Sequence, residues 1–366
     1  MRVVRLNAIN VRCLKDAECA PDAGVNVILG ANGSGKTSFL EALSILCLGR
    51  SFVSNQTRDV VSKGENVLGV RGEFVDTSGQ QFDVKVRKSK TATEIRLNGE
   101  PVKSASDLAQ ITPIVVIESQ ARTLLEEGPG SRRNFMDRTM FHVEPGYVVA
   151  WKNYRRALGQ RNEVLRHKGS NLELAFWGAE MAKAADLVSN ARENLVSSLN
   201  LTLRELDPEL PGKLVGFSLT YQPGWNRQVG LEAHLESTIQ RDKDSGYTGI
   251  GAHRGDFSVK PSDPDQNYRL SRGLSKILAI AIYEAQGRFI FRRNGREPLY
   301  LVDDLAAEMD EELIRISFGL LTKSTRQCFY TSVKQPDLPE DLVRDGAMFH
   351  VEHDSDRRRS SLRRIL

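Results

Sequence analysis

The chain has 366 residues, of which 40% are hydrophobic and 27% charged, ordinary values for a globular protein with room for two or three domains. The formal net charge of +4 is too small to indicate a polyanionic partner, so local basic clusters must carry that argument. The four cysteines lack metal-ligand spacing and predict reduced, buried thiols in a cytoplasmic protein, and no stretch approaches the 18 consecutive apolar residues of a membrane span.

The first part of the chain is predicted to be rich in strands. Residues 2–12 alternate apolar and polar side chains, which is typical of a strand and not of a signal peptide. Further strands are predicted from period-two patterns or short apolar runs, with turn signals between them, over residues 25–30, 67–76, 81–89, 93–100 and 112–118.

A phosphate-binding loop lies between the strand at 25–30 and a predicted apolar helix that Gly49 ends. The stretch GANGSGKTSF, residues 30–39, fits the pattern G-x-x-x-x-G-K-S/T. Its glycines allow successive backbone N–H groups to curl around an anion, and the helix dipole adds to the attraction. Lys36 is expected to neutralise the outer phosphates and Thr37 to offer its hydroxyl to Mg²⁺. The sequence therefore predicts a nucleoside-triphosphate site.

The middle of the chain is predicted to be helical. Apolar periodicity predicts one amphipathic helix over 146–169 and a longer one over 171–206, with Asn171 as its cap. The short turn between them predicts an antiparallel helical hairpin. Periodicity alone fits a projecting arm and a packed helical subdomain equally well. Strand patterning resumes over 214–225.

The second half of the chain supplies the other parts expected of an ATP site. An apolar strand over 299–302 ends in Asp303 and Asp304, where one acid can hold Mg²⁺ and the other can orient the attacking water. Upstream, Ser271 is predicted to cap a helix, and a serine with backbone amides at a helix start can cradle an anion. By itself that helix would be interpreted as an ordinary core helix, but its place before the acidic strand favours the site.

This order of elements resembles the ABC-type ATPase head, in which the serine-capped helix reaches the nucleotide of a second copy. The predicted fold is α/β: a P-loop ATPase head with mixed sheets, interrupted by an inserted helical arm. We expect the head in residues 1–110 and 235–366 and the arm in residues 111–234.

Longer motifs make the resemblance specific. From residue 1 to about residue 352 the chain resembles the RecF family, bacterial recombination-mediator ATPases related to the heads of SMC proteins. The stretches that carry the resemblance are GANGSGKTSFLEAL, EEGPGSRRNFMDRTMFHVEPGY, WKNYRRALGQRNEVLR, GAHRGDF, LSRGLSKIL, LYLVDDLAAEMD and MFHVEH.

The resemblance implies an ATP- and Mg²⁺-dependent homodimer that clamps single-stranded or gapped DNA and strand junctions in replication and repair. It implies RecR and RecO as partners and a role in loading RecA. It also implies that Asp303 is the magnesium aspartate, Asp304 the second acid, and Asp310 part of a loop that meets the opposite subunit. The family's phosphate loop corresponds to Gly30, Ala31, Asn32, Gly33, Ser34, Gly35, Lys36, Thr37 and Ser38. Its signature motif, which contacts the partner's ATP, corresponds to Ser271, Arg272 and Gly273.

Several positions depart from the family pattern. Val115 stands where the family has a glutamine, which leaves open whether Gln120, or less plausibly Gln56, contacts Mg²⁺. Leu274 replaces the glutamine of the signature motif, and residues 251–253 read GAH in place of GPH. Asp304 is one methylene shorter than the glutamate of many ABC ATPases, so we expect slow hydrolysis. After the strand at 326–333, Thr331 and Ser332 stand where transporter ATPases place a switch histidine, which argues against a transporter.

DNA contact that is independent of sequence needs basic side chains that face phosphates. The best cluster lies on the first arm helix, and a solvated helix face balanced by Glu163 explains it about as well. The arginine-rich end of the chain is expected to be loose. The predicted contacts are Lys152, Arg155, Arg156, Arg161 and Arg166.

Two other classes of function are compatible with a phosphate loop. A small-molecule phosphotransferase would need a second substrate cleft, and the insert and the capped helix argue against it. An SMC-like or nuclease-associated ATPase head would need an insert of hundreds of residues to build a coiled coil, and the helical stretch of this insert, residues 119–206, has roughly ninety.

Overall fold

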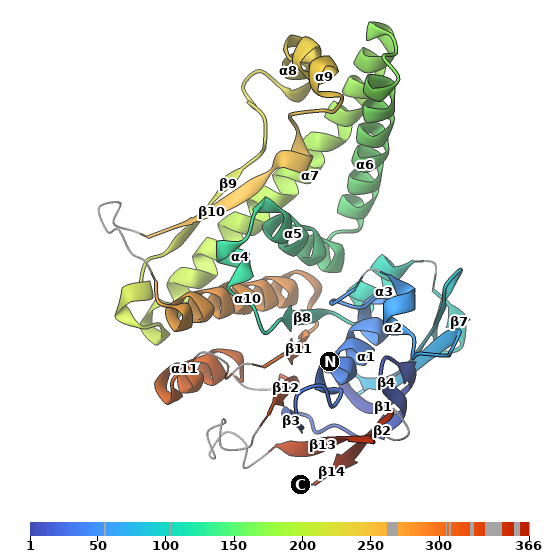
Figure 1. Ribbon diagram of the computed structural model, residues 1–366. Coiled ribbons are helices and arrows are strands. Elements are labelled where there is room, and N and C mark those ends of the chain that lie inside the picture. Colours follow the sequence, from blue (N-terminus) through green and yellow to red (C-terminus); the bar gives the residue numbers. More distant parts are fainter. Residues whose placement is uncertain are drawn as a thin grey trace. The chain divides into compact units, whose positions relative to one another are not determined.

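The computed structural model describes the chain except residues 55, 103, 262–269, 305, 307–308, 323–325, 334–345, 355–358 and 366, and the side chains of 353–361. It divides into two compact units, a head unit of Met1–Arg122 with Arg269–Leu366 and an arm unit of Thr123–Tyr268 (Figure 1). The arm unit begins later than the expected residue 111, because strand β8 (Ile114–Ile117) pairs with β11 of the head unit. It extends beyond residue 234, because β10 (Asp256–Lys260) pairs with β9 (Ser218–Gln222).

The head unit is built on a mixed sheet. Among the described residues the sheet has 12 strands in the order β7-β6-β5-β4-β1-β2-β14-β13-β3-β12-β11-β8. Besides β8, these strands are β1 (Arg2–Val11), β2 (Leu14–Cys19), β3 (Val25–Leu29), β4 (Val67–Val75), β5 (Gln81–Ser89), β6 (Thr93–Leu97), β7 (Glu100–Pro101), β11 (Leu299–Val302), β12 (Cys328–Ser332), β13 (Ala347–Asp354) and β14 (Arg359–Arg364).

The strands β13, β3, β12, β11 and β8 run parallel, and they place the functional loops together. β12 lies between β3 and β11 and pairs with both. Because parallel strands end at the same edge of a sheet, the segments that follow β3 and β11 emerge at that edge on either side of β12. These segments are the phosphate loop and the pair Asp303 and Asp304.

Helix α1 of the head unit packs against strands β1 and β4 of this sheet (Figure 1). The helix α1 buries almost its whole length, including Phe39, Leu43 and Leu46. It ends at Gly49, which adopts a left-handed backbone with φ of 65° at the C-cap, as the sequence predicts. The helices of this unit are α1 (Lys36–Leu48), α2 (Thr57–Val60), α3 (Ala105–Ile111), α10 (Arg272–Asn294) and α11 (Glu311–Leu321).

A buried polar network attaches α10 to β11. The Glu284 carboxylate on α10 is fully buried and accepts hydrogen bonds from the Tyr300 hydroxyl at 3.0 Å and from Arg326 Nη1 at 2.5 Å. Arg288 Nε, one turn further along α10, donates to the same carboxylate at 2.7 Å. Because removal of one partner would leave an uncompensated buried charge, this network fixes the helix relative to the strand that carries Asp303.

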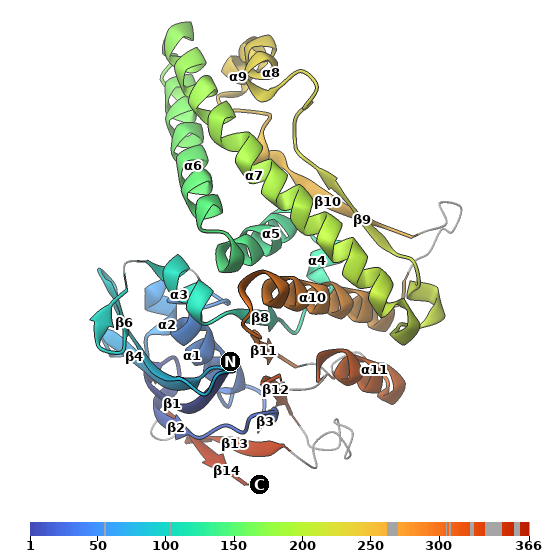
Figure 2. The ribbon, with the colours of Figure 1, turned by 180° about the vertical axis from the view of Figure 1, so that it is seen from behind.

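The arm unit is dominated by an antiparallel hairpin of α6 (Pro145–Arg166) and α7 (Asn171–Leu206), as predicted (Figure 2). The N-cap of α7 is Ser170 and not Asn171: the Ser170 hydroxyl accepts from the Glu173 N–H at 3.2 Å, and the Glu173 carboxylate accepts from the Ser170 N–H. The other elements of the unit are α4 (Thr123–Glu126), α5 (Pro129–Val143), α8 (Leu231–Ser237), α9 (Ile239–Ser245), β9, β10 and the short 3₁₀ turns at 207–209, 212–214 and 252–254.

The arginine-rich end of the chain, expected to be loose, forms strand β14. Its backbone pairs with β13 from Phe349 opposite Arg364 to Asp354 opposite Arg359. The Arg364 guanidinium also lies 3.1 Å from the Asp22 carboxylate. Pairing along the sheet therefore outweighs the polar composition of this segment. In the described part of the chain, none of the helices combines the length and apolar character that crossing a membrane requires.

Candidate nucleotide-binding site

The loop from β3 to α1 has the strand–loop–helix setting predicted for it. Gly30 allows a close backbone approach, because a Cβ there would lie 2.5 Å from Ser34 Oγ and 2.7 Å from the carbonyl oxygen of Val351. Lys36 begins α1, and its Nζ folds back to donate to the carbonyl oxygens of Gly30 at 2.8 Å and Ala31 at 3.0 Å. The ammonium group therefore lies over the loop.

Thr37 and Asp303 meet although 266 residues separate them. The Thr37 hydroxyl lies 3.1 Å and 3.0 Å from the two carboxylate oxygens of Asp303. A hydroxyl beside a single carboxylate is a hard oxygen donor set, which fits Mg²⁺ when nucleotide phosphates and water complete the coordination. The residues that the sequence nominated for the metal therefore fit it.

Thr331, at the end of β12, joins the two acids. Its hydroxyl donates to Asp303 Oδ1 at 2.7 Å and accepts from the backbone N–H of Asp304 at 2.8 Å. Asp304 has a left-handed backbone with φ of 49°, which is uncommon for a residue other than glycine. Its carbonyl oxygen accepts from Lys276 Nζ of α10 at 3.1 Å. The second acid is therefore held from both neighbouring elements.

Sequence reasoning noted Thr331 only as the replacement of a histidine, and it missed Lys276. The sequence did contain an indication for Thr331. This hydroxyl residue lies near the end of β12, at the edge of the sheet where β3 and β11 also end. Lys276 had a weaker signal, an isolated basic residue in an apolar helix. Only 2% of Lys276 is exposed, so its ammonium group requires buried partners such as the Asp304 carbonyl.

These groups line a cavity of about 300 Å³. Four lining residues were not among the predicted site residues: Cys13, Ser119, Thr331 and Val333. Burial lowers the pKa of Lys36, while the nearby charges of Asp304 and Asp303 act in the opposite direction. A phosphate chain would act in the same direction as the two carboxylates. The lining residues are Cys13, Asn32, Gly33, Gly35, Lys36, Thr37, Ser38, Ser119, Asp303, Asp304, Thr331 and Val333.

The signature residues lie outside this cavity. Ser271 is the N-cap of α10, as predicted, and its hydroxyl accepts from the Leu274 N–H at 3.3 Å. Ser271 and Arg272 are exposed, whereas Gly273 is buried. Asp310 is exposed and caps α11 by accepting from the Leu313 N–H at 2.9 Å. The structure therefore does not bring these four residues to the phosphate loop of their own chain.

The position of the family's glutamine is occupied by a core side chain. Val115 is fully buried in β8. Gln120 and Gln56 are both exposed, and neither belongs to the described residues that line the cavity. Ser119, two residues after the end of β8, does line the cavity.

The predicted DNA contacts on α6 divide into two groups. Lys152, Arg155 and Arg156 are exposed, and exposed Arg166 lies 3.1 Å from the Glu163 carboxylate. The prediction of a DNA contact is wrong for Arg161, because only 1% of this residue is exposed and it is not available to DNA.

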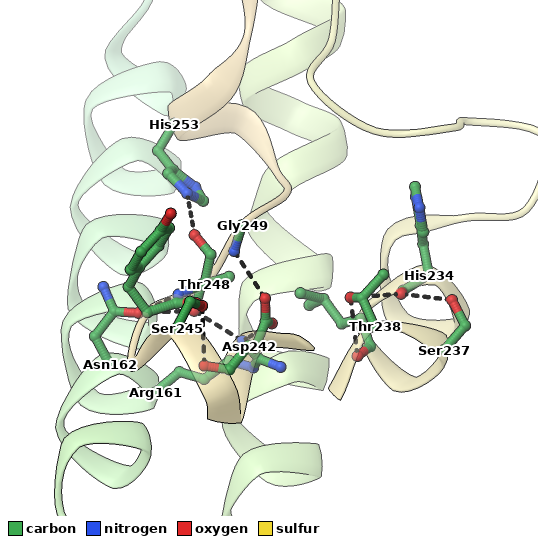
Figure 3. Close-up of polar contacts among 12 residues, drawn as sticks. Arg161, Asn162, His234, Ser237, Thr238, Asp242, Ser245, Thr248, Gly249 and His253 are labelled. Carbon is green, nitrogen blue, oxygen red and sulfur yellow. Dashed lines mark hydrogen bonds and ion pairs between the residues drawn. The ribbon is translucent and has the colours of Figure 1, made fainter. Parts of the chain in front are cut away.

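The guanidinium of Arg161 is instead part of the packing of the arm unit. Its Nη1 donates to Asp242 at 2.7 Å and to the Thr248 hydroxyl at 2.8 Å (Figure 3). Asp242 also accepts from the Gly249 N–H at 2.9 Å, and Asn162 accepts from both the N–H and the hydroxyl of Thr248. The face of α6 that carries Arg161 is therefore covered by the segment from α9 to residue 249.

The fold and this cavity define an ABC-type ATPase head with a helical insert. Residues 2–353 match the model of the RecF/RecN/SMC N-terminal domain family. The chain is 36% identical over 357 residues to the DNA replication and repair protein RecF of Shewanella baltica, and 33% identical over 354 residues to that of Shewanella frigidimarina. Each alignment covers 96% of this chain and 98% of the relative. The chain belongs to the RecF family.

Solved structures agree with this fold. A structure described as the recombination mediator protein RecF with ATP aligns with a TM-score of 0.84 at 22% identity, over 96% of this chain and 95% of that one. An SMC head bound to the C-terminal winged-helix domain of ScpA aligns with a TM-score of 0.56 at 14% identity, over 100% and 98%. At these identities the likeness concerns the fold.

Proposed function

We propose that the protein is an ATP-dependent DNA-binding protein that acts as a recombination mediator in replication and repair. The observation that best supports ATP binding is the contact between the Thr37 hydroxyl and the Asp303 carboxylate beside the phosphate loop. Membership of the RecF family supports the repair role. We place this activity in the cytoplasm, where RecR and RecO are the expected partners in loading RecA.

In this proposal the backbone N–H groups of residues 30–38 hold the phosphates of ATP. Lys36 leaves its loop carbonyls to neutralise the outer phosphates, and Thr37 with Asp303 holds Mg²⁺. Bound Mg²⁺ would neutralise charge that develops on the phosphates. Asp304, fixed by Thr331 and Lys276, is placed to orient the attacking water.

We further propose that the ATP site is completed by a second copy of the chain. Ser271 and Arg272 are exposed at the start of α10 and lie outside the cavity of their own chain, which supports a role on the partner's nucleotide. Gly273 and Asp310 would support the same interface. Because the Asp304 side chain is short, hydrolysis is expected to be slow, which suits a clamp that stays closed for a time.

The proposed ligand is gapped or single-stranded DNA and its junctions with duplex, held through phosphates. Lys152, Arg155 and Arg156 support this because they are exposed on one stretch of α6. Arg166 contributes less, since Glu163 already pairs with it.

A binding measurement tests the proposal. The affinity of the full chain for a fluorescent gapped duplex should rise at least about tenfold when Mg²⁺–ATP replaces Mg²⁺–ADP, because only ATP closes the dimer. ADP is the control that keeps the nucleoside and the metal and lacks only the γ-phosphate. Equal affinity in the two nucleotides would overturn ATP dependence, and no measurable binding in either would overturn DNA as the ligand.

A further inference from the structure

The turn at residues 251–255 of the arm unit is held by side chains from three helices. The Tyr154 hydroxyl of α6 lies 2.7 Å from the Nδ1 atom of His253. The Nε2 atom of His253 lies 3.0 Å from the Thr248 carbonyl oxygen (Figure 3). Arg192 of α7 donates to the Ala252 carbonyl oxygen at 2.7 Å. Arg133 of α5 donates to the Gly255 carbonyl oxygen at 3.2 Å.

These contacts bring together three arginines that lie far apart in sequence. Arg254 is the residue between His253, which α6 contacts, and Gly255, which α5 contacts. Arg155 follows Tyr154 on α6, and Arg133 itself contacts the turn. We call Arg133, Arg155 and Arg254 the arginine cluster. Arg155 and Arg254 are exposed, and Arg133 is half-buried.

The cluster has excess positive charge. The two nearby carboxylates are already paired, Asp256 with Arg132 at 2.7 Å and Asp137 with Arg192 at 2.7 Å. In the described part of the chain, the ion pairs include no member of the arginine cluster, so the cluster has a local charge of +3.

The electrostatic surroundings of two groups agree with this crowding. Burial lowers the pKa of Arg133, and the charges of Arg192 and Arg254 lower it further against Asp256 and Asp137. Burial also lowers the pKa of His253 to about 4, with Arg254, Arg133 and Arg155 acting in the same direction, so the imidazole is neutral near pH 7. Like charges that are held close together repel one another, and a bound anion would reduce this repulsion.

An exposed aromatic ring borders the cluster. The guanidinium carbon of Arg254 lies 5.6 Å from the centre of the Tyr247 ring, and 50% of Tyr247 is exposed. The guanidinium carbon of Arg155 lies 5.7 Å from the Trp151 ring. Cations beside exposed aromatic rings are the combination that binds a single strand, since cations take the phosphates and rings stack on bases. An acidic protein surface would have no need of the exposed ring.

We propose that the arginine cluster binds the phosphates of a single-stranded nucleic acid and that Tyr247 stacks on one of its bases. This inference rests on the proposed DNA-binding function and assigns it a site. The proposed nucleic-acid contacts therefore include the turn at 251–255 and helix α5, in addition to those expected from α6.

The test compares full-length variants in the presence of Mg²⁺–ATP, by fluorescence anisotropy on a 20-nucleotide oligo-dT and a 20-base-pair duplex. Arg133→Gln with Arg254→Gln should weaken oligo-dT binding at least about tenfold and reduce the slope of log affinity against log salt by about 1.4, since each lost phosphate contact contributes about 0.7. The matched control is Arg241→Gln with Lys213→Gln, two exposed cations elsewhere in the arm unit, and it should leave affinity within about twofold.

Two further variants keep the test independent of folding. Arg254→Gln alone removes only the side-chain contact with Tyr247 and should lower the affinity for oligo-dT in part. Tyr247→Ser should lower the affinity for oligo-dT at least about fivefold and leave the affinity for the duplex unchanged. A double variant that binds oligo-dT as well as its control would overturn the proposal and leave an acidic protein as the ligand of the cluster. If the wild-type chain binds neither oligonucleotide, the proposed function itself fails.

Discussion

Replacement of Arg161 with leucine is expected to lower the free energy of unfolding of the arm unit by about 3–5 kcal/mol, since it leaves the Asp242 carboxylate buried without its cation. Asp242 and Arg161 are each about 1% exposed, so water cannot take the place of the missing partner. All three tryptophans, Trp151, Trp177 and Trp225, lie in this unit. Urea unfolding followed by tryptophan fluorescence therefore measures the change directly.

The neighbouring Arg156→Leu variant is the control for loss of charge on the same helix. Arg156 is exposed, so its replacement should change stability by less than about 0.5 kcal/mol. The double variant Arg161→Met with Asp242→Leu should recover most of the loss, because an apolar pair replaces a buried ion pair at little cost. A single Arg161→Leu variant as stable as wild type would show that the pair contributes nothing.

The second large effect is expected at Thr331. Thr331→Val should lower the rate of ATP hydrolysis at least about tenfold, because it removes the hydrogen bonds to the Asp303 carboxylate and to the Asp304 N–H, each worth about 1 kcal/mol or more. Affinity for ATP should change little, since Lys36 and the loop amides are untouched. Steady-state kinetics separate the two effects as a lower kcat at similar KM.

Thr331→Ser is the matched control, since it keeps the hydroxyl and loses only a methyl group. It should retain at least about a third of the wild-type rate. A valine variant as active as wild type, beside a serine variant that loses activity, would mean that packing of the buried methyl group, and not orientation of the two acids, is what Thr331 provides.

Local signals made the head of the protein predictable. The phosphate loop could be found because its spacing, the preceding strand and the following helix all lie within residues 25–49. Ser271 could be predicted as a cap because capping depends on the next three residues. Asp303 and Asp304 could be predicted because they directly follow an apolar strand in a chain that also has a phosphate loop.

Long-range partners made the rest unpredictable. Arg161 looks like its basic neighbours on α6, and the residue that buries it, Asp242, lies 81 positions away. Helical periodicity identified α7 to the residue, whereas its cap depends on whether Ser170 or Asn171 points back along the chain. The last strand was missed because its arginines carry no hydrophobic pattern, and pairing with β13 stabilises it instead.

The ATP turnover of a mixture of two inactive variants tests most directly whether the site is shared between two copies. Lys36→Arg removes the phosphate contact of its own chain, and Ser271→Arg blocks the surface offered to the partner. If two copies form each site, an equal mixture should regain about a quarter of the wild-type rate, because half the dimers are mixed and each holds one intact site of two. A mixture as inactive as the separate variants would contradict the shared site.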